Sequence, residues 1–349
     1  MIPLFKPFMP PLPCLQEILQ SGKLSYGEYT RKFEQRLREY FNTDNVLVTN
    51  TFASAISVAL TTKNIVGGDE VILSPMGCLV SSQPYLTAGL KIVWADVDPS
   101  TGTLCPDSVK KKITTKTKAI VHNHYCGYPG YIDEINAIGK ENGLVVIDDG
   151  IECFGSEYKN RKVGSGQSDV AIFSLSPVRI PNTIDGGIIV FKSKEDYEKA
   201  LIVRDCGIDR KRFRDFRGEI SLDCDISQLG YSALMSDVNG YIGTCQMEYV
   251  DELIAKQRLR ARKWDEFFKV KSDITPVSTP NGLSNYWVYG VLANDKIKTL
   301  ETFRENGFFA SGVHVKNNAY SVFNNAENLK GVDDFYSKFL ALPCGWWME

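Results

Sequence analysis

Short apolar runs of strand length alternate with amphipathic stretches through the first two-thirds of the chain. The stretch 28–41 places Phe33, Leu37 and Phe41 four residues apart, and 133–142 has a similar apolar face, which predicts two helices. The strand-length apolar runs are 71–73, 92–94, 119–121, 144–147 and 171–173. Continuous apolar strands separated by helices predict an α/β fold, with a mostly parallel central sheet that helices cover on both faces.

The pattern changes in the last third of the chain. A long helical pattern covers 235–263, a strand pattern covers 287–292, and a further helical pattern covers 299–306. We therefore expect a large domain with an N-terminal arm over residues 1–234. Residues 235–349 are expected to form a long linking helix and a smaller C-terminal α+β domain.

Composition excludes several classes of protein. The 349 residues carry a formal net charge of -2, which gives no electrostatic reason to expect nucleic acid or an anionic membrane as a partner. The apolar runs are far shorter than a membrane-spanning helix requires, and residues 1–7 lack the pattern of a signal peptide. We therefore expect a cytoplasmic protein.

The cysteines and histidines do not predict a metal site. Nine cysteines are scattered along the chain without C-x-x-C spacing, so we expect free thiols and neither zinc nor a disulfide framework. His122 and His124 would share one face of a strand, but the local sequence offers them no carboxylate and no third ligand. The expectation is that the chain binds no metal.

Residues 170–191 predict a strand, a polar loop with two prolines and Arg179, a Gly186-Gly187 turn and a second strand. This segment resembles the cofactor-lysine segment of the DegT/DnrJ/EryC1/StrS family, the pyridoxal 5′-phosphate (PLP) sugar aminotransferases. Further segments resemble the family's motifs in the same order, namely 2–5 with 21–27, 96–99, 119–129, 147–150, 204–207 and 229–236. The resemblance implies the aspartate aminotransferase fold (fold type I), PLP as cofactor, glutamate as amino donor and a nucleotide-linked keto-sugar as acceptor. It also implies a tail helix beyond residues 342–347, which we expect to be missing.

The resemblance assigns positions at the cofactor. Asp149 matches the aspartate that pairs with the pyridinium nitrogen, and Ser174 and Thr51 match positions that bind the phosphate. Ser232 falls in the stretch that a neighbouring subunit contributes. Arg179 stands where the family has the lysine that forms the Schiff base. A guanidinium stays protonated, whereas Schiff-base formation needs a deprotonated amine, so we expect no catalytic residue in this chain.

Other positions also depart from the family's pattern. Phe52 stands at the phosphate-binding helix end and is expected to obstruct it, Cys78 replaces the aromatic that stacks on the ring, and Glu152 replaces a glutamine or histidine. Ser176 replaces a frequent histidine, and Ser232–Leu234 replaces an Asn-x-Arg stretch. Together these departures predict a degenerate or absent cofactor site.

Two interpretations of Arg179 follow from its position. It is either a solvated loop charge or a guanidinium that fills the vacated pocket. In the second case it would pair with Asp149 or Asp148, because a buried guanidinium needs a carboxylate partner.

Three functions are compatible with these residues. The first is the lysine-less subunit of a heterodimer, inactive alone, whose lysine-containing paralogue holds PLP. The second is a stand-alone PLP- or pyridoxamine-phosphate-dependent enzyme with altered chemistry, which is disfavoured because arginine cannot transfer protons as histidine does. The third is a non-catalytic nucleotide-sugar-binding or regulatory protein, in which Tyr26, His314 and Lys316 lie in segments that resemble sugar-side loops. We favour the first.

Overall fold

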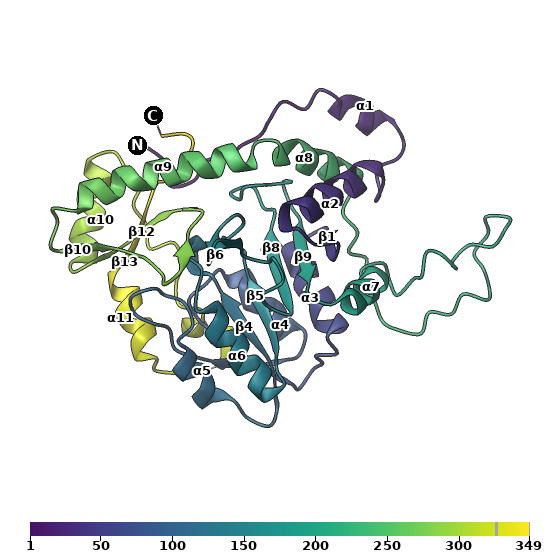
Figure 1. Ribbon diagram of the computed structural model, residues 1–349, viewed down its shortest axis with the longest axis horizontal. Helices are drawn as coiled ribbons and strands as arrows, with labels where there is room; N and C mark the ends of the chain where they lie inside the picture. The colour runs from purple at the N-terminus through teal and green to yellow at the C-terminus, as the bar shows by residue number, and fades with distance from the viewer. Residues whose placement is uncertain (325–326, 349) are drawn as a thin grey trace.

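A seven-stranded sheet forms the centre of the computed structural model, which describes residues 1–324 and 327–348 (Figure 1). The strand order is β1 (Val46–Thr49), β9 (Gly187–Phe191), β8 (Val170–Ser174), β5 (Val145–Asp149), β4 (Thr117–Asn123), β2 (Glu70–Leu73) and β3 (Lys91–Trp94). Strand β9 is antiparallel to β1 and β8, and the other neighbouring strands are parallel. The predicted α/β fold with a mostly parallel sheet is confirmed.

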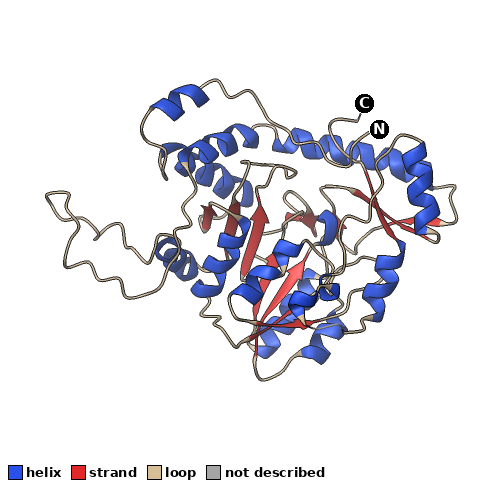
Figure 2. Ribbon diagram, turned by 180° about the vertical axis from the view of Figure 1, so that it is seen from behind, coloured by secondary structure: helices blue, strands red, loops and turns tan. Residues whose placement is uncertain are grey.

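Helices pack on both faces of this sheet (Figure 2). The helices of this part of the chain are α1 (Leu15–Gln20), which lies apart from the sheet, α2 (Glu28–Phe41), α3 (Phe52–Thr62), α4 (Gln83–Thr87), α5 (Pro106–Lys112), α6 (Ile132–Asn142) and α7 (Lys194–Val203), with short 3₁₀ turns at Leu79–Ser81 and Tyr125–Gly127. Along β5, Ile147 packs in the core cluster that contains α3, whereas Val146 packs in the cluster that contains α6. Since side chains alternate along a strand, Asp148 and Asp149 point to opposite faces of the sheet.

Two helices, rather than the expected single helix over 235–263, lead out of the large domain. They are α8 (Asp237–Met247) and α9 (Val250–Phe268), with Glu248 and Tyr249 between them. Helix α8 packs against α2, while α9 contributes Trp264 to a separate core beneath the C-terminal sheet. The first turns of α9 still pack in the core of the large domain through Val250 and Ile254, whereas its later turns reach the C-terminal core, and the apolar spacing alone does not mark the break.

The C-terminal part contains an antiparallel sheet in the order β10 (Ile274–Pro276), β12 (Tyr289–Ala293), β13 (Phe339–Leu342). Its helices are α10 (Lys296–Glu305) and α11 (Lys330–Lys338), with 3₁₀ turns at Asn317–Ala319 and Ser321–Phe323. A third sheet, β11 (Gly282–Leu283), β6 (Glu157–Tyr158) and β7 (Arg161–Lys162), pairs a strand of this part with two of the large domain. All nine cysteines are free thiols. None of the described helices has both the length and the apolar character needed to cross a membrane.

An extended arm, residues 207–231, leaves the body between α7 and α8 and reaches well beyond it (Figure 1). An isolated β-bridge between Asp205 and Ser232 joins its two ends, and another between Arg214 and Ile220 lies near its tip. The arm therefore has little contact with the rest of its own chain.

Candidate functional site

The candidate site lies where β5 and β8 end side by side. These strands are parallel, so Asp149 and Ser174, their last residues, lie at the same edge of the sheet. Glu152 follows β5 by three residues, and the loop after β8 carries Arg179. Topology therefore brings together four residues that the sequence had linked only through the resemblance.

Arg179 is buried, with 7% of its surface exposed. Its Nη2 atom lies 3.6 Å from Oε1 of Glu152, and its guanidinium lies 4.3 Å from the ring centroid of Trp287. The Trp287 indole in turn stacks on Phe5 at 4.4 Å and donates a hydrogen bond to the Val178 carbonyl. The interpretation of Arg179 as a solvated loop charge is therefore wrong.

The carboxylate partner of Arg179 also differs from the prediction. It is Glu152, and among the described residues neither Asp149 nor Asp148 makes an ion pair with Arg179. Asp148 points to the opposite face of the sheet, which places its carboxylate out of reach of the loop after β8. The sequence pointed to a vacated pocket, but only the structure identifies which acid shares it.

Glu152 is the centre of this cluster. Its Oε1 atom lies 2.8 Å from His314 Nε2, and its Oε2 atom accepts a hydrogen bond of 2.8 Å from the Cys126 backbone N–H. Burial would raise the pKa of Glu152, but His314 and Arg179 outweigh burial and lower the pKa below its ordinary value. Glu152 is therefore an ionised, fully engaged carboxylate.

Asp149 is in the opposite electrostatic situation. It is buried, and burial, with the nearby charge of Glu152 adding to it, raises the pKa of Asp149 to about 6. Its Oδ1 atom accepts a hydrogen bond from the Ile151 backbone N–H, whereas its Oδ2 atom has no hydrogen-bond partner among the described residues. A buried acceptor without a donor is costly and requires an explanation.

The two other predicted cofactor positions differ in how their hydroxyls are engaged, because Thr51 also donates a 2.9 Å hydrogen bond to Ser54 Oγ. Ser174 is buried, and its Oγ atom accepts a 3.3 Å hydrogen bond from Ser176 N–H, which leaves the hydroxyl proton free to donate. Thr51 is the N-cap of α3, and its Oγ1 atom accepts from Ser54 N–H at 3.0 Å. The side chain of Phe52 is buried in the large core cluster, and its expected obstruction of the helix end stays a prediction.

The predicted substrate residues do not gather at one place. His314 joins the site through Glu152. Tyr26 instead donates to Glu34 Oε2 at 2.7 Å and lies against the buried Arg204, on the wall of a separate 780 Å³ cavity. Lys316 pairs with Asp333 of α11. No described contact joins either of these two side chains to the cluster around Arg179.

Ser232, the residue assigned to a neighbouring subunit's site, lies at the foot of the arm. It is exposed, and its carbonyl accepts a hydrogen bond of 3.2 Å from Asn50 Nδ2. Its role toward a second chain stays a prediction.

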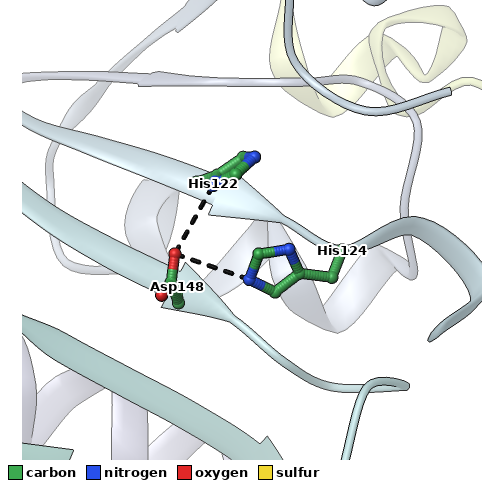
Figure 3. A group of neighbouring side chains, drawn as sticks. All are labelled: His122, His124 and Asp148. Atoms are coloured by element: carbon green, nitrogen blue, oxygen red, sulfur yellow. Dashed lines mark ion pairs between the residues drawn. The ribbon is translucent and has the colours of Figure 1, made fainter. Parts of the chain in front are cut away.

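A second buried cluster joins His122 and His124 to Asp148, which the sequence did not connect with them because it lies on the adjacent strand (Figure 3). Asp148 of β5 is in register with His122 of β4, and its Oδ1 atom lies 3.4 Å from both His122 Nδ1 and His124 Nε2. Ser168 donates a 2.6 Å hydrogen bond to the other carboxylate oxygen. Burial lowers the pKa of His122, while the two neighbouring histidines outweigh burial and lower the pKa of Asp148.

The protonation of His124 argues against a metal ion at this cluster. Its Nδ1 atom accepts a 3.1 Å hydrogen bond from Gly130 N–H, so in the neutral ring the proton sits on Nε2, the nitrogen that faces Asp148. A histidine that binds a metal through one nitrogen normally carries a proton on the other and donates it. These requirements conflict, and the expectation that the chain binds no metal stands as a prediction.

The native residues do not fit covalently held PLP. Asp149 with its free oxygen, Ser174 and the N-terminus of α3 fit the ring nitrogen and the phosphate. Arg179 cannot form a Schiff base, and Glu152 adds a negative charge beside an anionic cofactor. The cavity lined by Glu152, Ser174, Arg179 and Trp287, among others, measures about 10 Å³, the space of roughly one water.

Comparisons with known proteins identify the family and the fold. A sequence model described as the DegT/DnrJ/EryC1/StrS aminotransferase family matches residues 12–349. The UDP-4-amino-4,6-dideoxy-N-acetyl-beta-L-altrosamine transaminase of Helicobacter pylori is 28% identical and aligns over 95% of this chain and 91% of its own. GDP-perosamine synthase of Escherichia coli O157:H7 is also 28% identical, over 80% and 72%. The sugar aminotransferase CalS13 of Micromonospora echinospora superposes with a TM-score of 0.93 at 26% identity, covering 100% of this chain and 96% of that one.

Proposed function

Because the chain belongs to the DegT/DnrJ/EryC1/StrS aminotransferase family, we propose that it is the lysine-less subunit of a heterodimeric nucleotide-sugar aminotransferase. A lysine-containing paralogue holds PLP, and the pair transfers an amino group from glutamate to a keto-sugar on a nucleotide carrier. The present chain completes the dimer and does not transaminate alone. The reaction takes place in the cytoplasm.

One observation carries this proposal: the position of the Schiff-base lysine is held by an arginine that is buried and paired. Arg179 contacts Glu152 and Trp287 within the pocket, so no rotation of an exposed side chain would make room for the cofactor. Its guanidinium cannot serve as the amine, and it is a poor proton-transfer group at neutral pH. The chemistry then has to come from a second chain.

The arm supports the need for a second chain. It exposes the large apolar side chains of Phe216 (93% exposed), Ile220, Leu222, Ile226 and Leu229. Apolar side chains gathered on one segment favour burial against a partner. The foot of the arm carries Ser232, in the stretch that resembles the family's contribution to the neighbouring site.

A second candidate, a non-catalytic nucleotide-sugar-binding protein, has one observation in its favour. The 780 Å³ cavity beside Tyr26 is large enough for a small molecule, and Arg31, Arg210 and Lys211 line it. Asp205 pairs with Arg210 there, and Asp209 and Glu198 add further negative charge, so this cavity is less suited to an anionic ligand than its cations alone suggest.

Co-expression with the lysine-containing paralogue encoded nearest in the same genome tests the proposal. We expect the two chains to elute together and transaminase activity to require both. Phe216→Asp with Leu222→Asp should separate them, whereas Val270→Asp, at an equally exposed apolar position outside the arm, should not. A paralogue that is fully active as a homodimer and never elutes with this chain would refute the heterodimer and favour the nucleotide-sugar-binding function.

A further inference from the structure

We infer that Glu152 and Arg179 close the cofactor pocket as a matched pair, and that exchanging these two side chains alone, R179K with E152Q, makes the isolated chain bind PLP covalently. The inference concerns the chain's own pocket and does not depend on a partner. If two residues alone close the pocket, replacing them restores cofactor binding. If many positions have lost their function, replacing these two does not.

The pairing of charges is the first argument. Glu152 is buried and ionised, held by His314 and the Cys126 N–H, and it supplies the only carboxylate that forms an ion pair with Arg179 among the described residues. Removing Glu152 would leave the buried charge of Arg179 without a carboxylate, which is strongly unfavourable, whereas Glu152 would keep its contacts with His314 and the Cys126 N–H. The two departures from the family's pattern are therefore one structural unit.

The same electrostatics predicts that replacing Arg179 alone is insufficient. A lysine amine placed beside an ionised Glu152 would keep its proton, because a neighbouring opposite charge favours the charged form. An ammonium group cannot attack an aldehyde. E152Q removes that charge while its amide oxygen can still accept the hydrogen bond from the Cys126 N–H, so the amine can deprotonate.

The remaining framework is the second argument. The Oδ2 atom of Asp149 is a buried acceptor without a hydrogen-bond partner among the described residues, although the nearby Ser81 hydroxyl lowers the pKa of this carboxyl against the effect of burial. An acceptor of this kind suits the N–H of a pyridinium ring. The Ser174 hydroxyl proton has no hydrogen-bond acceptor in the described part of the chain, and α3 keeps an N-terminus capped by Thr51. These three features do not bond to one another in the closed pocket, yet each matches a group that a phosphorylated pyridine presents.

The reaction in the double variant is a condensation that needs no other reactant. The deprotonated amine introduced at position 179 attacks the aldehyde carbon of PLP. The carbonyl oxygen leaves as water, and a carbon–nitrogen double bond replaces the carbon–oxygen double bond. Borohydride reduces that bond to a stable amine, which intact-protein mass spectrometry detects as a permanent label.

The test compares the native chain with R179K, E152Q, R179K/E152Q and the amine-free control R179Q/E152Q. Each purified chain is titrated with PLP, followed by visible absorbance, and then reduced and weighed. We expect the label on R179K/E152Q, with PLP binding at least about tenfold tighter than to R179K, and no label on the native chain or the control. Equal labelling of R179K and the double variant would overturn the paired closure, as would a folded double variant that takes no label.

A second measurement keeps the inference testable if the double variant does not fold. Pyridoxamine 5′-phosphate needs no lysine, so its binding to R179A/E152A can be measured by calorimetry. Binding that the native chain lacks would support the inference, and a folded R179A/E152A that binds none would overturn it. Neither result depends on whether a paralogue pairs with this chain.

Discussion

Replacing Asp149 with asparagine should raise the free energy of unfolding, relative to that of the native chain, more at pH 7 than at pH 4. Burial raises the pKa of Asp149 from 3.8 to about 6. A group whose pKa is higher in the folded state favours folding while it is protonated, and it loses that contribution as pH rises through the folded pKa. For a shift of about two units, the native chain should lose about 2 kcal/mol between pH 4 and pH 7 through this group alone.

The assay is urea unfolding of the native chain and D149N at several values of pH. The asparagine side chain adds an unsatisfied donor next to a buried pocket, but that cost is the same at every pH. At each pH we subtract the free energy of unfolding of the native chain from that of D149N. This difference should be about 2 kcal/mol larger at pH 7 than at pH 4. The exposed D44N serves as the control. A D149N effect that is identical at both pH values would refute the reasoning.

The remaining predictions concern the two buried clusters. E152A should destabilise the chain by about 3 kcal/mol, because it leaves the buried charge of Arg179 without a partner. The control E252A, in an exposed pair with Lys256, should change the unfolding free energy by less than about 0.5 kcal/mol. Equal effects of the two substitutions in urea unfolding would contradict the pairing of Glu152 with Arg179. D148N should cost about 3 kcal/mol at neutral pH. Because the folded pKa of Asp148 is lowered, that difference should shrink as pH falls below the unfolded value, and a constant difference would contradict the assignment. A chelator should leave the melting temperature unchanged, whereas a fall would reveal a bound metal at the histidine cluster.

The fold was largely predictable from the sequence because its signals are local. Five apolar runs and the helices between them correspond to central strands and their covering helices. The break between α8 and α9 was not predictable, because the apolar spacing continues through Glu248 and Tyr249 and α9 resumes packing in the same core. Strand β9 being antiparallel is likewise a property of the assembled sheet.

The site was predictable only in part. The resemblance located Arg179 and Glu152. Which acid pairs with Arg179, however, depends on the side of the sheet that each candidate carboxylate faces. Trp287 stacks on Arg179 although the two residues are more than a hundred positions apart in the sequence, and no local pattern predicts such a contact. The prediction that the local sequence offers His122 and His124 no carboxylate holds for the sequence. The structure supplies Asp148 from the neighbouring strand.

The central claim is that this chain holds no working cofactor site and completes one on a partner. Native mass spectrometry of the co-expressed pair, saturated with PLP and reduced with borohydride, tests it most directly. The account predicts a heterodimer with a single reduced PLP, attached to the lysine-containing chain and never to this one. Two labels per dimer, or a label on this chain, would contradict it.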